Sequence, residues 1–351
     1  PRLQASAELT LASLRYQEDR FAEQIKFARS ALSYYADYGF LDAADRALIL
    51  IGRGERELGD YDAALKEGLH LVEQAQKVGS APFVAMGEEL LGGVLLNTEH
   101  YPDALMHYKH ALETTEAMGR DPTYQQIHYA NTLWRLGRYD EAEAMLEKVS
   151  PAQRSKADIR ASIVATRAEM LESRGNAKAA LALLNATRAT LEPSQFEGSL
   201  QQDFTVAQTM LGSWTEAKAG AAHLVAVAQS EHNPADLASG QMMLAEIDLH
   251  TGNPASALAE AEQAEEFFRG KGKEESQAVS LLLQAEAAHQ LGQRGVDVAL
   301  SRKSLDIFWH LQQSWGVPVF RIYATRPDRR QTMRALGNLC AANGAPCNVP
   351  S

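Results

Sequence analysis

The sequence has few cysteines, no long apolar run and no excess of positive charge. Its 351 residues include two cysteines, both after residue 339, so a disulfide-rich fold is excluded. One of the longest apolar stretches, Leu90 to Leu96, contains two glycines and is far shorter than the roughly 20 residues that span a bilayer. The net charge of −11 disfavours nonspecific binding to nucleic acid, which requires cations that neutralise phosphates. We therefore expect neither a nucleic-acid partner nor membrane insertion.

Catalytic motifs are also missing. No glycine-rich loop follows the nucleotide-binding patterns, and no Gly-x-Ser-x-Gly elbow is present. His107 and His110 have the i,i+3 spacing of two metal ligands on one helix face, but no third ligand has a fitting spacing. An exposed helix face explains this pair more simply. The sequence therefore predicts a noncatalytic protein with no metal and no cofactor.

The main motif of the sequence is a recurrent turn signature. It is clearest in Leu58-Gly59-Asp60-Tyr61-Asp62-Ala63-Ala64 and returns from Leu136 and from Leu211. Weaker copies begin at Asp19, Glu99, Gly175, Gly252 and Gly292. The position that carries the aromatic residue recurs at 21, 61, 101, 139, 177, 214, 254 and 294, at intervals of 37 to 40 residues. Such a fixed period is typical of a solenoid.

The residues of each turn have separate physical roles. Glycine ends one helix because it adopts the left-handed conformation without a steric cost. The aromatic residue two positions later covers the crossing point of two helices, and an alanine three positions further on allows them to approach closely. Segments such as Ala43 to Leu58 carry apolar residues at three- and four-residue spacing. Each repeat is therefore predicted to be a hairpin of two helices of about 16 residues.

The Gly-x-aromatic-x-x-Ala turn, with Gly52 and Gly92 seven positions before it, resembles the tetratricopeptide repeat (TPR) family. The resemblance covers residues 1 to about 312 and implies an all-α, right-handed superhelical solenoid of about eight helix hairpins. The repeats are longer than the usual ~34 residues. HEAT repeats share this longer period but do not usually carry this turn. Residues 313–351 are predicted to form a C-terminal cap and tail.

The resemblance also implies that the first helix of each hairpin lines a concave surface. Counting back from each turn glycine places arginines, amides and aromatics on its N-terminal part, which suits an acidic peptide. The predicted peptide-binding residues are Arg46, Arg53, Arg56, Asn97, Tyr124, Asn131, Trp134 and Arg135. The alternative is that the arginines pair with Glu55, Glu57 and Glu89 and bind nothing. The same count also places Glu89 on this surface. It makes the C-terminal part more acidic, with Glu169, Glu172, Glu246 and Glu286.

The C-terminal segment has two interpretations. Phe308, Trp309, Trp315 and Phe320 favour a cap that closes the last hairpin, whereas Arg326-Pro327-Asp328-Arg329-Arg330 suits a basic docking element. Cys340 and Cys347 form either a local disulfide or two free thiols. Free thiols agree with a cytoplasmic location, which we expect, and a disulfide would indicate an extracytoplasmic one.

Two functions remain after these exclusions. The first is a noncatalytic scaffold that binds a protein or peptide in the concave groove. The second is the sensor or regulatory region of a larger bacterial signalling protein, such as a kinase or a transcription regulator. Because the chain begins with Pro1 rather than Met, we expect it to be part of something larger. Neither the identity of the partner nor the oligomeric state follows from the sequence.

Overall fold

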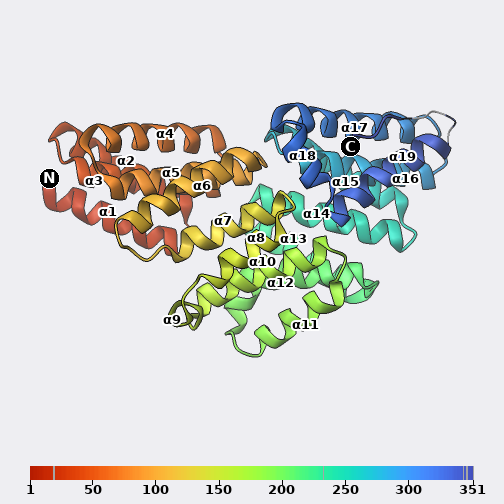
Figure 1. The fold of residues 1–351 in the computed structure, drawn as a ribbon, viewed down its shortest axis with the longest axis horizontal. Helices are drawn as coiled ribbons and strands as arrows, with labels where there is room; N and C mark the ends of the chain where they lie inside the picture. The colour runs from red at the N-terminus through yellow and green to blue at the C-terminus, as the bar shows by residue number, and fades with distance from the viewer. Residues whose placement is uncertain (19, 232, 343, 345–346, 351) are drawn as a thin grey trace. The chain divides into compact units, whose positions relative to one another are not determined.

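The computed structural model describes residues 1–18, 20–231, 233–342, 344 and 347–350. Asp19, which opens the first copy of the turn, lies outside these residues. The described residues form nineteen helices and no strand (Figure 1). Contacts divide the chain into two compact units, Pro1–Thr132 (unit 1) and Leu133–Ser351 (unit 2). The division falls within one helix.

In the described residues, eight helix hairpins follow one another, as the turn signature predicts. The first four are α1 (Arg2–Gln17) with α2 (Phe21–Asp37), α3 (Leu41–Glu57) with α4 (Tyr61–Val78), α5 (Ala81–Asn97) with α6 (Tyr101–Ala117), and α7 (Thr123–Arg135) with α8 (Tyr139–Glu147). After the short α9 (Pro151–Arg154), the next four are α10 (Ala157–Ser173) with α11 (Ala177–Arg188), α12 (Pro193–Met210) with α13 (Trp214–Ser230), α14 (Pro234–His250) with α15 (Pro254–Gly270), and α16 (Glu274–Gln290) with α17 (Val296–Trp315). The chain ends with α18 (Val317–Ala324) and α19 (Pro327–Ala342).

The two helices of a hairpin have different surroundings. The second helix buries a single stripe, such as Tyr61, Ala64, Gly68, Leu71 and Ala75 of α4. The first helix is buried on more than one side, because it packs against its partner and also against the first helix of the next hairpin. The α3–α5, α10–α12 and α14–α16 pairs are examples of this second contact. The first helices of neighbouring hairpins therefore share a surface in each unit, which we call the inner face.

The turn chemistry is confirmed at each clear copy. Gly59, Gly137 and Gly212 all have φ between +72° and +81°, the left-handed region that favours glycine. Glu99 occupies the same position in a weaker copy and has φ of +66°. The small position of the motif is alanine in six copies, at 64, 104, 142, 180, 217 and 257, and each of these alanines is completely buried. A larger side chain there would separate the two helices.

The glycines seven positions before the turn lie at close contacts between helices. A Cβ on Gly92 would lie 3.0 Å from the ring of Tyr108 on α6, and one on Gly52 would overlap Leu90 on α5. Both residues thus permit close contact between helices. Asp60 and Asn176 cap the following helices, since their side-chain oxygens accept hydrogen bonds from the amides of Ala63 and Ala179.

The last two helices cover the final hairpin. Phe320 and Tyr323 of α18, with Met333 and Leu336 of α19, share one apolar cluster with Phe308 of α17. Cys340 and Cys347 form a disulfide, with 5.8 Å between their Cα atoms. This bond holds the tail against α19, and Trp309 Nε1 donates a hydrogen bond to the carbonyl of Asn348 at 3.2 Å.

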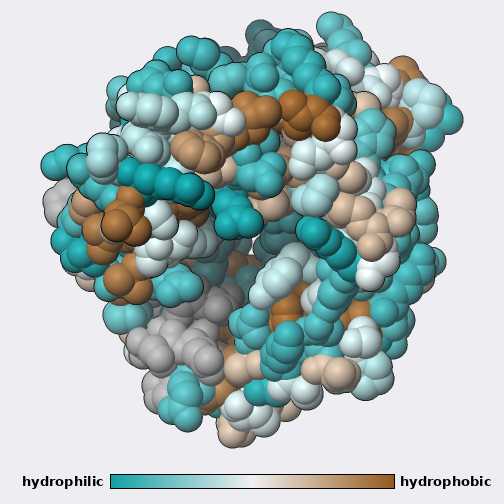
Figure 2. Space-filling view, turned by 90° about the vertical axis from the view of Figure 1, so that its left-hand side faces the viewer, coloured by the Kyte–Doolittle hydropathy of each residue, from teal (hydrophilic) through white to brown (hydrophobic). Residues whose placement is uncertain are grey.

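Figure 2 shows a face on which hydrophilic residues predominate and hydrophobic residues occur in small groups. Among the described residues, no helix combines the length and hydropathy that crossing a membrane requires.

Candidate functional site

A ladder of polar side chains crosses the inner face of unit 1. Arg53 on α3 contacts Glu89 on α5, with 3.3 Å between Nη2 and Oε1. Gln125 on α7 donates from Nε2 to the other oxygen of Glu89 at 2.7 Å. Three consecutive hairpins are thus joined by one carboxylate. Arg53 and Glu89 are both positions that the repeat pattern assigns to the groove, so their contact supports that alignment.

A second arginine lies deeper in the same face. Arg56 forms an ion pair with Glu57, and its guanidinium occupies the space where a side chain on Gly93 would lie. The rings of Tyr108 and His128 stack nearby, with centroids 5.3 Å apart. Burial lowers the pKa of His128, and Arg56 and Arg53 add to this effect against the opposing charge of Glu89. The region therefore combines two arginines with a neutral imidazole.

The other residues predicted for unit 1 remain closer to solvent. Arg46 is exposed, and Tyr124 is 53% exposed on the first turn of α7. Asn97 and Asn131 are half-buried. Arg53 and Arg56 form the ion pairs that the alternative interpretation named, with Glu89 and Glu57, whereas Glu55 pairs with Arg29 instead. Part of the basic character of the site is therefore already neutralised within the chain.

The remaining two predicted residues, Trp134 and Arg135, belong to unit 2. Arg135 Nη2 lies 3.0 Å from Oε1 of Glu169 on α10, another pair of predicted groove positions. Trp134 is only 4% exposed, because the guanidinium groups of Arg135 and Arg326 lie 4.7 and 5.0 Å from its ring centroid. Trp134 is therefore covered by its own chain.

Arg326 is the centre of a contact that the repeat pattern does not foresee. It lies between α18 and α19, is almost completely buried, and donates from Nη1 to the carbonyl of Arg135 at 2.6 Å. Its Nη2 atom lies 2.6 Å from Asp328 Oδ2. A Cβ on Gly137 would lie 2.8 Å from the carbonyl oxygen of Ile322. The end of unit 2 thus packs directly on its first turn.

Beyond Arg135, the inner face of unit 2 carries carboxyl groups. Burial raises the pKa of Glu172 to about 10, with further contributions from Asp203 and Glu169. Glu172 is 8% exposed, and its Oε1 accepts no hydrogen bond among the described residues. Burial likewise raises the pKa values of Asp203, Glu246 and Glu286. Glu172, Glu246 and Glu286 occupy predicted groove positions, whereas the pattern did not select Asp203, Gln125 or His128.

The histidine pair has a partner within its own unit. Nδ1 of His107 lies 2.6 Å from Glu88 Oε2, and His110 lies 3.8 Å from the other oxygen. No group of three or more His, Cys, Asp or Glu side chains in the described part of the chain is arranged to hold a metal ion.

These observations define a class of protein: an all-α array of helix hairpins whose first helices form a polar inner face. Two models of the tetratricopeptide repeat match the sequence, at residues 95–165 and 238–263. These matches and the fold support the tetratricopeptide repeat family. A search of curated proteins found no match.

Solved structures share this fold at low sequence identity. A Rap protein complexed with competence and sporulation factor is 12% identical, with a TM-score of 0.56, and the match covers 97% of this chain and 100% of that one. A signal transduction ATPase with numerous domains (STAND) from Pyrococcus horikoshii, which has a tetratricopeptide repeat sensor, is 18% identical, with a TM-score of 0.51. That match covers 82% of this chain and 44% of the STAND protein. At these identities the likeness extends to the fold alone.

Proposed function

We propose that this chain is a noncatalytic scaffold that binds an acidic peptide or protein segment on the inner face of unit 1. The observation that carries the proposal is the ladder of Arg53, Glu89 and Gln125 across three consecutive hairpins. It places polar groups of adjacent repeats in one row, which an extended chain can follow. An incoming carboxylate would compete with Glu89 for Arg53, and exposed Arg46 and Tyr124 would supply further contacts.

The fold supports this proposal in two ways. Solenoids of helix hairpins offer extended surfaces and are typically used for binding. In addition, the Rap protein of similar fold was solved as a complex with competence and sporulation factor. Because fold does not determine function, the proposal rests on the residues of unit 1.

The proposal can be tested with peptides selected from a random decamer library displayed on phage. The affinity of a selected acidic peptide would be measured for the wild type, for Arg53→Glu with Arg56→Glu, and for Arg46→Glu alone. Lys26→Glu with Lys66→Glu is the charge-matched control, because both lysines are exposed on second helices.

We expect the first double variant to weaken binding at least tenfold, which corresponds to about 1.4 kcal/mol, and the control to leave it unchanged. Arg46→Glu checks the result without disturbing an ion pair of the ladder. Unchanged affinity in both inner-face variants would refute the proposal.

A second function, as the sensor region of a larger signalling protein, is favoured by one comparison. The STAND protein contains a repeat region of similar fold as a sensor, and the match covers less than half of that protein. A kinase, nucleotidase or DNA-binding domain encoded in the same reading frame would favour this alternative. The binding experiment above applies to both functions, since a sensor also needs a ligand.

The disulfide bears on the compartment in which the protein works. Structural disulfides persist in oxidising compartments and are rare in the cytosol. On this ground we propose an extracytoplasmic location, in place of the cytoplasmic one that the sequence favoured. Alkylation of thiols during cell lysis tests it: modification of Cys340 and Cys347 in protein from its native source would exclude the proposal.

A further inference from the structure

The C-terminal 39 residues are basic in an otherwise acidic chain. They contain five arginines, one aspartate, and no lysine or glutamate. Two of the arginines are used internally, since Arg326 and Arg329 form ion pairs with Asp328 and Glu275. Arg321, Arg330 and Arg334 are exposed and form no ion pair within the described residues.

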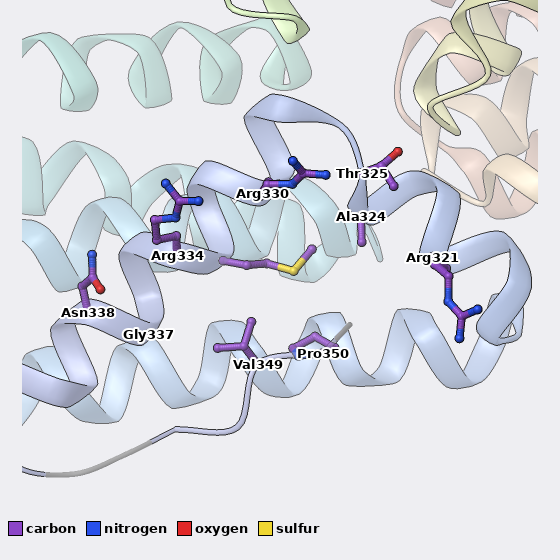
Figure 3. Close-up of a pocket in the computed structure, with 10 residues that line it drawn as sticks. Arg321, Ala324, Thr325, Arg330, Arg334, Gly337, Asn338, Val349 and Pro350 are labelled. Carbon is purple, nitrogen blue, oxygen red and sulfur yellow. The ribbon is translucent and has the colours of Figure 1, made fainter.

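These three arginines border one cavity. It has a volume of about 480 Å³ and lies between α18, α19 and the tail. Met333 and Val349 contribute apolar surface, and Asn338 adds an amide. Figure 3 shows Arg330, Arg334 and Asn338 succeeding one another along α19. Cavities of this size that combine an apolar lining with a few polar groups are typical of ligand sites.

The tail forms the second wall of the cavity. Val349 and Pro350 line it, and the Cys340–Cys347 disulfide and the hydrogen bond from Trp309 to Asn348 hold this segment in place. Gly337 allows the tail to approach, since a Cβ there would lie 3.4 Å from Val349 Cγ2. The cavity therefore has two fixed walls of different chemistry: a row of donors on α19 and an apolar tail.

The spacing of the donors indicates the shape of the ligand. Arg330, Arg334 and Asn338 are four residues apart, so they lie on one helix face at intervals of about 6 Å. Alternate side chains of an extended peptide lie on one side at intervals of about 6.7 Å. A peptide with carboxylates at alternate positions would therefore match the donor row, and its intervening side chains would face Val349 on the opposite wall.

We propose that the cavity between α18, α19 and the tail binds an extended segment of a partner protein in which acidic and apolar residues alternate. Arg330 and Arg334 would each donate charge-assisted hydrogen bonds to one carboxylate, and Arg321 extends the basic rim. This site belongs to unit 2 and is formed by residues other than those of the inner face of unit 1. The C-terminal segment then serves both as a cover for the last hairpin and as a docking element.

The test measures fluorescence anisotropy of a fluorescein-labelled Glu-Leu-Glu-Leu-Glu peptide with the full chain. We expect Arg330→Glu with Arg334→Glu to weaken binding at least tenfold. Val349→Asp, on the opposite wall, should weaken it as well, without altering the arginines. The charge-matched control is Arg294→Glu with Arg302→Glu, two exposed residues outside the cavity, and it should bind as the wild type does. Circular dichroism would verify that every variant is folded.

Four results would overturn the proposal. The first is that the Arg330/Arg334 variant binds the alternating peptide with unchanged affinity. The other three are that the wild type binds a different probe as tightly as the alternating peptide: a Gln-Leu-Gln-Leu-Gln peptide, a Glu-Glu-Glu-Leu-Leu peptide, or a single-stranded oligothymidylate of the same charge. The Arg53→Glu with Arg56→Glu variant separates this site from the proposed function. It should bind the alternating peptide normally, and a loss of binding there would assign the peptide to unit 1.

Discussion

The inner faces of the two units are built from the same repeat but accommodate ionisable side chains differently. The position six residues before the turn holds Arg53 and Asn131 in unit 1, and Glu169, Glu246 and Glu286 in unit 2. In unit 1 a carboxylate is bridged by an arginine and a glutamine. In unit 2 burial raises the pKa values of Glu172 and Asp203, so these carboxyl groups keep their protons to higher pH than free carboxyl groups do. Repeat position thus fixes where a side chain lies, and its chemistry is set separately in each unit.

The units also differ in their dependence on contacts between residues distant in sequence. The inner face of unit 1 is joined by neighbouring hairpins alone. In unit 2, Arg326 links the C-terminal helices to the turn after α7. Although burial works against its charge, Asp328 is ionised, because Arg329 and Arg326 lower its pKa to about 2.

The largest expected effect comes from removing Arg326. Arg326→Met should lower the free energy of unfolding by about 3–5 kcal/mol, because it breaks a buried ion pair and removes the hydrogen bond to Arg135. Arg53→Met, which breaks a partly exposed pair in unit 1, should cost less than about 1 kcal/mol. Urea denaturation measures both. Equal losses would mean that the contact in unit 2 is no more important than an ordinary ion pair.

A smaller effect is expected from an alanine on the turn that Arg326 covers. Gly137→Ala should cost about 2–4 kcal/mol, because the left-handed residue is strained and its Cβ would meet the Ile322 carbonyl. Gly252→Ala is the matched control, since Gly252 has nearly the same φ and no atom within 4 Å of its Cβ position. It should cost only about 1 kcal/mol. If thermal unfolding shows the same loss for both, α18 does not pack closely on Gly137.

The pH dependence of stability tests whether Glu172 in unit 2 is buried as a neutral acid. Its pKa is about 10 in the folded chain, chiefly because of burial, against an ordinary value of 4.5. The folded state therefore retains a proton that the unfolded state loses, so stability is full below pH 4.5 and declines as the pH rises toward 10. Glu172→Gln removes this titration. Its free energy of unfolding should exceed that of the wild type by about 1–3 kcal/mol at pH 8 and by almost nothing at pH 4.5.

The charged groups around Glu172 are Glu169 on its own helix and Asp203 on α12, and Arg135 on α7 acts on Asp203. Glu89→Gln in unit 1 is the contrasting variant, because it weakens the ladder and should destabilise the chain slightly at pH 8. Urea denaturation at several pH values measures both. If Glu172→Gln increases the free energy of unfolding by the same amount at every pH, the carboxyl of Glu172 is not buried as a neutral acid.

The sequence predicts the repeating part of this structure well, because each repeat uses the same local chemistry. Gly59 and Gly137 end helices in the left-handed conformation, and Ala64 and its equivalents are buried at helix crossings. The pairing of Arg53 with Glu89 was one of two sequence-based alternatives, and its residues share the predicted face.

What the sequence does not predict is contact between parts that do not repeat. Trp134 occupies a groove position by its place in the repeat, but it is covered by Arg326, 192 residues later in the chain. No local signal encodes that contact. Similarly, the pattern marks Glu172 as a groove residue but does not indicate that Asp203 lies close enough to raise its pKa.

The central claim, that unit 1 binds its partner on the inner face, is tested most directly by site-specific photocrosslinking. A benzoyl-phenylalanine would replace either Tyr124 on α7 or Leu69 on α4, which are 53% and 54% exposed and lie on a first and a second helix of unit 1. The selected acidic peptide would be added before irradiation, and the crosslinked product would be identified by mass spectrometry. We predict a crosslink from position 124 and none from position 69. A crosslink from position 69 alone would contradict the account.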